Sequence, residues 1–147
     1  MSILDKLNNK QREAAAKIEG ALLILAGAGS GKTRTITYRI AHMIDEIGIS
    51  PYKILAVTFT NKAAKEMKER VESLVGEDAK RVMISTFHSF GLRLLRVYGD
   101  RLGYNANFTI YDTDDQKRVA KNIMKDLVVK DKSLKEGLVA SIISKLK

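Results

Sequence analysis

The chain of 147 residues contains no cysteine, only two histidines and a single proline. The lack of cysteine excludes disulfides and any thiolate-bound metal. The histidines, His42 and His88, are isolated in the sequence and do not indicate a zinc site. The sequence therefore points away from a disulfide framework and from a zinc centre.

Long apolar segments are also absent. No run approaches the roughly 20 apolar residues of a membrane-spanning helix. The N-terminus lacks the basic, apolar and small-residue order of a signal peptide. The hydrophobic fraction of 45% nevertheless suffices for the buried core of one domain. We expect a soluble, cytoplasmic protein without a membrane partner.

Acidic residues are fewer than basic ones. The chain has 17 Asp and Glu against 26 Lys and Arg, which gives a formal net charge of +9. Such an excess is typical of proteins with a polyanionic partner. Much of it, however, occurs at helical spacing beside acids, as on a solvated helix face. Charge alone leaves nucleic-acid binding undecided.

A glycine-rich loop stands between an apolar run and a helical pattern. Residues 21–25 predict a strand, and a helix is expected from about Arg34. A strand, a glycine-rich loop and a helix in this order form the nucleotide-binding P-loop. The loop consists of Ala26, Gly27, Ala28, Gly29, Ser30, Gly31, Lys32 and Thr33.

Each part of this loop has a chemical role in a P-loop. The backbone N–H groups point at phosphate oxygens, and the helix N-terminus adds partial positive charge. Lys32 would reach the β- and γ-phosphates, and Thr33 would offer its hydroxyl to Mg²⁺. Ala26 stands where the strict pattern has glycine, a small change that we expect to be tolerated. The loop predicts a site for a nucleoside triphosphate; the alternative is a turn that merely joins a strand to a helix.

Helices alternate with short apolar runs over the first two thirds of the chain. Continuously apolar runs predict parallel strands covered on both faces. Strands and helices in alternation form a parallel sheet, whose ligands lie at the carboxyl ends of the strands. The predicted fold is therefore α/β over residues 1–90. Helices are expected over residues 7–19, 33–47 and 61–75, and further strands over 54–57 and 82–84.

The last third of the chain is expected to be helical. Asn8 or Asn9 is the predicted cap of the helix over residues 7–19, and Asn61 is the predicted cap of the helix over residues 61–75. In the last third, Thr113 and Gln116 predict a capping box at the start of the helix over residues 113–127. These later helices predict a separate, incomplete subdomain over residues 91–147. The expected elements are a helix over 89–103, an extended segment over 108–111, and helices over 113–127 and from about Ser133.

An apolar strand ending in aspartate, which holds Mg²⁺ in P-loop enzymes, is not found. The nearest match is residues 108–112, but Thr109 interrupts it, and the acids that follow favour a helix start. The sequence therefore contains the nucleotide-binding half of such an enzyme without its hydrolytic half.

Three further segments have a distinctive order. Residues 7–11 (LNNKQ) precede the loop, 56–64 (AVTFTNKAA) follow one strand, and 85–89 (STFHS) follow the next. In this order and spacing they resemble the opening of the UvrD/Rep/PcrA family of superfamily-one DNA helicases, over essentially the whole chain. The resemblance implies a RecA-like P-loop motor domain with an inserted helical subdomain. It also implies ATP-dependent unwinding of DNA in repair or replication.

The resemblance assigns nucleotide contacts outside the loop. Gln11 matches a glutamine whose amide pairs with N6 and N7 of adenine, and Arg34 matches an arginine that stacks beside the base. From the residues alone, each is an ordinary polar group on a helix surface. ATP and Mg²⁺ are the implied cofactors.

The resemblance also assigns DNA contacts. Phe59 matches an aromatic residue that stacks on a base of single-stranded DNA, which suits movement along any sequence; the alternative is a core phenylalanine. Small polar residues nearby match contacts to phosphate and sugar, although a histidine here is more often structural. They are Thr58, Thr60, Asn61, Thr86 and His88.

The chain departs from the family by what it omits. Full members carry an Asp-Glu magnesium strand, further DNA-contacting aromatics and a second motor domain with arginines. The resemblance therefore implies an N-terminal fragment that binds ATP and single-stranded DNA but neither hydrolyses nor unwinds alone. Two alternatives stay open. One is a small P-loop phosphotransferase, and the other is a nucleic-acid or partner-binding module with a relic P-loop.

Overall fold

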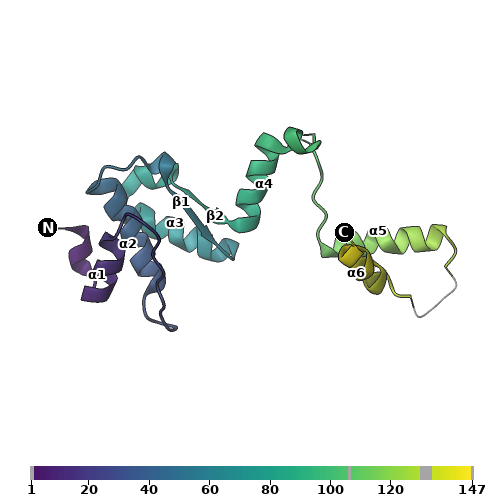
Figure 1. The fold of residues 1–147 in the computed structure, drawn as a ribbon, viewed down its shortest axis with the longest axis horizontal. Helices are drawn as coiled ribbons and strands as arrows, with labels where there is room; N and C mark the ends of the chain where they lie inside the picture. Colours follow the sequence, from purple (N-terminus) through teal and green to yellow (C-terminus); the bar gives the residue numbers. More distant parts are fainter. Residues whose placement is uncertain (1, 106, 130–133, 147) are drawn as a thin grey trace. The chain divides into compact units, whose positions relative to one another are not determined.

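A computed structural model describes residues 2–105, 107–129 and 134–146 (Figure 1). The chain forms two compact units, Met1–Tyr98 and Gly99–Lys147, each described here by itself. The first contains η1 (Ile3–Lys6), α1 (Asn9–Ala16), α2 (Lys32–Asp45), η2 (Pro51–Lys53), β1 (Leu55–Thr58), α3 (Asn61–Val75), η3 (Gly76–Arg81), β2 (Met83–Thr86) and α4 (Phe87–Tyr98). The second contains η4 (Gly99–Leu102), α5 (Thr113–Asp126) and α6 (Glu136–Leu146).

The two strands of the first unit pair in parallel. Leu55 lies opposite Met83, and Thr58 lies opposite Thr86. The connection between them contains α3, as expected for a crossover between parallel strands. This confirms the mixed α/β character and the parallel pairing. The prediction that the strands are covered on both faces is wrong for Leu55, which is 47% exposed.

The strand predicted over residues 21–25 is not formed. In the described part of the chain the sheet consists of β1 and β2 only, and residues 21–25 have no regular structure. Leu23 is 79% exposed and Leu25 85% exposed. A strand needs a neighbouring backbone to satisfy its N–H and C=O groups. Because β1 and β2 pair with each other and leave this segment unpaired, its apolar pattern is not sufficient for a strand.

The core of the first unit lies between α2, α3 and the sheet (Figure 1). Ile40 and Ile44 of α2 pack with Met67 and Val71 of α3. These side chains recur at three- and four-residue spacing, which places them on one helix face. The packing holds α2 against α3, which in turn packs on β1 and β2.

Helix starts in the first unit follow the predicted chemistry with one displacement. Asn8 caps α1 and forms a capping box with Gln11. Thr60, rather than Asn61, caps α3, because its hydroxyl accepts a hydrogen bond from the Ala63 N–H at 3.1 Å. Asn61 is instead the first helical residue. Helix α1 also ends earlier than predicted, at residue 16.

In the second unit, α5 and α6 pack against each other. Asp112 and Asp115 form the capping box of α5, so the prediction of Thr113 and Gln116 is displaced by one residue. Residues 108–111 form no strand. The predicted start of the last helix near Ser133 lies outside the described residues.

The remaining features are the segment over residues 89–103 and the length of the helices. The expected helix over residues 89–103 is α4 followed by the short 3-10 helix η4. None of the described helices has the length and apolar character needed to cross a membrane.

Candidate nucleotide and nucleic-acid sites

The glycine-rich loop leads directly into α2. Gly29 and Gly31 have φ values of +76° and +84°, in the left-handed region that favours glycine. The N–H of Thr35 donates to the Gly31 carbonyl at 2.9 Å, the first bond of the helix. The N–H groups of residues 32–34 therefore precede the intrahelical bonds, and the helix dipole favours an anion beside them.

The side chain of Lys32 folds over the loop. Its Nζ donates to the carbonyl oxygens of Ala26 at 2.9 Å and Gly27 at 2.7 Å. Thr33, in the first turn of α2, is half-buried. An ammonium group and a hydroxyl thus lie beside the available N–H groups, a donor set that fits phosphate oxygens.

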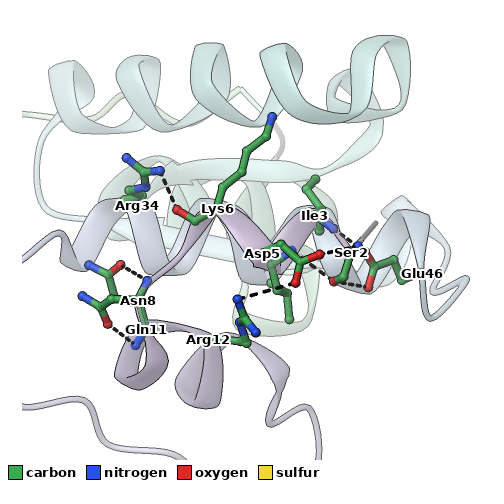
Figure 2. A network of polar contacts seen from close by, with 10 residues as sticks. Ser2, Ile3, Asp5, Lys6, Asn8, Gln11, Arg12, Arg34 and Glu46 are labelled. Carbon is green, nitrogen blue, oxygen red and sulfur yellow. Dashed lines mark hydrogen bonds and ion pairs between the residues drawn. The ribbon is translucent and has the colours of Figure 1, made fainter.

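Gln11 connects α1 to this loop. Its Nε2 donates to the Ser30 carbonyl at 3.0 Å. Its Oε1 accepts from the Asn8 N–H at 3.3 Å (Figure 2). A Cβ placed on Gly31 would lie 2.6 Å from the Gln11 Nε2. A side chain at residue 31 would therefore displace the Gln11 amide, and the φ angle of +84° independently favours glycine there.

A cavity of about 260 Å³ lies between α1 and the loop. Gln11 borders it from α1, and Lys32 borders it from the start of α2. An amide and an ammonium from sequence-distant elements therefore face one space. The lining residues include Asn8, Gln11, Ala26, Ser30, Lys32 and Thr35.

Arg34 does not line this cavity. Its guanidinium donates to the Lys6 carbonyl at 2.8 Å (Figure 2). The guanidinium also lies 5.3 Å from the centre of the Tyr38 ring. The structure thus brings Gln11 and Lys32 together and turns Arg34 toward the N-terminal segment and Tyr38.

The ends of β1 and β2 present two aromatic rings. Thr58 and Thr86 are opposite each other in the parallel register, and a phenylalanine follows each. Phe59 is 88% exposed and Phe87 is 53% exposed. Their ring centres are 5.7 Å apart at an interplanar angle of 48°. Phe59 is therefore a surface residue, and the alternative of a core phenylalanine is excluded in this structure.

The polar residues at the strand ends have two kinds of surroundings. The hydroxyl of Thr60 caps α3. Thr86 is buried, and its hydroxyl accepts from the Ser89 N–H and donates to the Ser89 Oγ. Asn61 and His88 are exposed in the first turns of α3 and α4. Thr58 is half-buried in β1.

Comparison with known proteins decides the family. Residues 7–147 match the model of the UvrD/REP helicase N-terminal domain. The chain belongs to this family. It is also 52% identical over 146 residues to the ATP-dependent DNA helicase PcrA of Staphylococcus epidermidis (strain RP62A). The identity to the protein of the same name from Staphylococcus aureus (strain Mu50) is 51%. In both cases the alignment covers 99% of this chain and 20% of the relative, so the chain spans about a fifth of these proteins.

One residue of the candidate site in this UvrD/REP domain has no role assigned by the sequence analysis. Phe87 acquires one only because β2 lies beside β1 and brings its ring to Phe59. The sequence does contain a signal, since the dipeptide Thr-Phe occurs at both strand ends, residues 58–59 and 86–87. Because parallel strands end at the same edge of the sheet, identical dipeptides at the ends of two adjacent strands place identical side chains next to each other.

The described residues of this UvrD/REP domain contain no side-chain cluster typical of a metal centre. No group of three or more histidine, aspartate or glutamate side chains lies close enough there to hold an ion. The Thr33 hydroxyl is thus the one predicted metal ligand of this chain.

Proposed function

We propose that this chain is the N-terminal part of an ATP-dependent DNA helicase that binds ATP at the loop and single-stranded DNA at the strand ends. The observation that carries the proposal is the convergence of Gln11 and Lys32 on one cavity beside the N-terminus of α2. The amide of Gln11 is suited to a base, and the ammonium of Lys32 is suited to a triphosphate. The name and 52% identity of the PcrA relative support the same activity.

In this proposal the triphosphate lies on a RecA-like P-loop. Lys32 binds the β- and γ-phosphates, and the backbone N–H groups hold the remaining oxygens. To do so, the ammonium exchanges the Ala26 and Gly27 carbonyls for phosphate oxygens, which form stronger charge-assisted bonds. Arg34 reaches the base if its guanidinium leaves the Lys6 carbonyl. The phosphate cradle comprises Ala26, Gly27, Ala28, Gly29, Ser30, Gly31, Lys32 and Thr33.

Mg²⁺ accompanies the triphosphate and neutralises its charge. The Thr33 hydroxyl would be the ligand that this chain supplies to the ion. The carboxylate ligand that the family resemblance implies, on an Asp-Glu strand, would come from the rest of the helicase.

Single-stranded DNA binds across the strand ends in this proposal. Phe59 stacks on a base, and Phe87 extends the aromatic surface beside it. Thr58, Asn61 and His88 contact phosphate and sugar. Thr60 and Thr86 act mainly through their capping bonds, which hold the starts of α3 and α4.

The complete reaction requires the rest of a helicase. Hydrolysis and strand separation depend on a metal carboxylate and on arginines from a second motor domain, which we propose as the partner of this chain. Such a protein acts where the DNA is, consistent with the cytoplasmic localisation expected from the sequence.

Isothermal titration with ATP tests the nucleotide site. We expect Lys32→Ala to remove most of the affinity for ATP·Mg²⁺ because its ammonium lies over the loop, where it would form charge-assisted bonds to phosphate oxygens. Lys68→Ala, on the exposed surface of α3, is the matched control and should bind as the unaltered chain does. Equal affinities for Lys32→Ala and the control would contradict the proposal. Transfer of phosphate to a nucleoside or nucleotide would favour the phosphotransferase alternative instead.

A further inference from the structure

Residues 2–11 form a strap that runs along α2. At its start, the Ser2 Oγ and the Ile3 N–H donate to the carboxylate of Glu46, at 3.0 and 2.6 Å (Figure 2). Glu46 is the residue that ends α2. The strap therefore begins at the C-terminal end of this helix.

The middle of the strap is held by packing and by one cation. Leu4 and Leu7 are buried and pack with Ala15 and the partly buried Tyr38. The Arg34 guanidinium, in the first turn of α2, donates to the Lys6 carbonyl. This contact lies near the N-terminal end of the same helix.

The strap ends at the nucleotide loop. Gln11 closes the capping box with Asn8, and its Nε2 donates to the Ser30 carbonyl. Ser30 directly precedes Gly31, the N-cap of α2. The strap is thus antiparallel to α2 and is attached beyond both ends of that helix, at Glu46 and at Ser30.

We propose that Glu46 is a positioning residue for recognition of the nucleotide base. Its carboxylate holds the first residues of the strap at the C-terminal end of α2. This fixes the path of the strap along α2 and therefore the position of Gln11 beside the loop. This inference rests on the proposed function, in which Gln11 contacts the base. The two bonds that Ser2 and Ile3 donate to Glu46 hold this end of the strap in place.

The hydrogen bonds of the Glu46 carboxylate indicate that this residue holds the strap and does not only stabilise the end of α2. Its carboxylate also accepts from His42 Nδ1 at 2.8 Å, a contact within the last turn of α2. The pKa of Glu46 lies below its ordinary value chiefly because of the Ile3 N–H, against a smaller opposing effect of desolvation; the Ser2 hydroxyl and His42 also lower it. The largest stabilisation of the carboxylate thus comes from the strap.

Titration of the chain with ATP and with inorganic tripolyphosphate tests the inference. Glu46→Ala should weaken ATP by about 2- to 10-fold, the effect of a single net hydrogen bond, and leave tripolyphosphate unchanged. Gln11→Ala should do the same. The double variant should bind ATP no more weakly than Gln11→Ala alone, because both changes act through one contact. Glu46→Gln keeps an acceptor for the Ile3 N–H and should retain most of the affinity.

Two further variants separate positioning from folding. Ser2→Ala removes one strap bond, leaves the His42–Glu46 pair and should shift ATP affinity in the same direction by less. Glu69→Ala removes a carboxylate of α3 that pairs with Lys65 and should have no effect. An equal loss for ATP and tripolyphosphate in Glu46→Ala, or additive losses with Gln11→Ala, would overturn the inference. Failure of the proposed function is distinguishable, because then Lys32→Ala would leave tripolyphosphate binding unchanged.

Discussion

The nucleotide loop and the strand ends are both polar segments that follow an apolar run, but they are built differently. At the strand ends, β1 and β2 pair in register, and the motifs that follow begin α3 and α4. Before the loop, residues 21–25 are unpaired and expose Leu23 and Leu25. The loop is positioned instead by Gln11 and by its own helix. One region is thus supported by a sheet, and the other by a strap.

This difference separates local from non-local causes of structure. The left-handed glycines and the start of α2 depend on residues within a few positions, so the loop adopts its conformation without a neighbouring strand. A strand has no such independence, because its backbone groups bond to another strand. We infer that the loop can have the donors of a nucleotide site while lacking the rigid support of a sheet.

The largest expected effect concerns catalysis at the loop. We predict negligible ATP hydrolysis by this chain, with or without DNA, because binding groups alone do not stabilise the transferring phosphoryl group. An arginine finger alone contributes a factor of about 10³–10⁵. Phosphate release is measured with and without single-stranded DNA. A turnover of about 1 s⁻¹ or more, usual for enzymes, would show that the loop region is catalytically complete.

The second prediction contrasts the supported and unsupported apolar residues. Met67→Ala, in the core beside the sheet, should lower the free energy of unfolding by about 2–5 kcal/mol. Leu25→Ala should change it by no more than about 0.5 kcal/mol, because that side chain is 85% exposed. Urea denaturation of both variants gives the comparison. If Leu25→Ala proved as costly as Met67→Ala, the segment before the loop would be buried in solution.

The third prediction concerns the strand ends. Phe59→Ala should lower the affinity for single-stranded oligonucleotides by about 1–3 kcal/mol, the value of one stacked base. Fluorescence anisotropy at two salt concentrations should show an unchanged salt dependence, because the ring carries no charge. Phe87→Ala should weaken binding too, with less than additive loss in the double variant.

Tyr52→Ala is the matched control for an exposed aromatic residue away from the strand ends. It should bind like the unaltered chain. The melting temperature of Phe59→Ala should stay close to that of the unaltered chain, since the ring is exposed. Intact DNA binding by a destabilised Phe59→Ala variant would mean that the ring serves the fold and not DNA.

The sequence predicted the parts of this molecule that have local causes. Asn8 and the glycine-rich loop follow from short-range rules and lie where expected. Displacements of one residue at Thr60 and Asp112 arise because the cap is the extended residue before the helix, and neighbouring polar residues compete for that place. The roles that we propose for Phe87 and Glu46 could not be assigned from the sequence, since they depend on contacts with residues far away in the chain.

The smallest expected effect is a response to acid that is confined to the loop region. Glu46 has a lowered pKa in the folded chain, so the stability contributed by its carboxylate is complete above its ordinary pKa of 4.5. That contribution is lost as the pH falls through the lower, folded value. Protonation weakens the bond from the Ile3 N–H and thereby the strap that reaches Gln11. The strand-end segments 58–64 and 85–98 contain no Asp or Glu and should not follow this carboxylate transition.

Backbone amide NMR shifts between pH 6 and pH 3 test this acid response. The Ile3 amide should titrate with Glu46, and the Gln11 and Ser30 amides should follow its curve because they lie at the other end of the strap. In Glu46→Gln, which has no carboxylate to titrate, the three amides should lose this common transition. Titration of the Phe59 amide along the same curve would show that acid loosens the whole unit. The distinction between a strap-supported and a sheet-supported region would then fail.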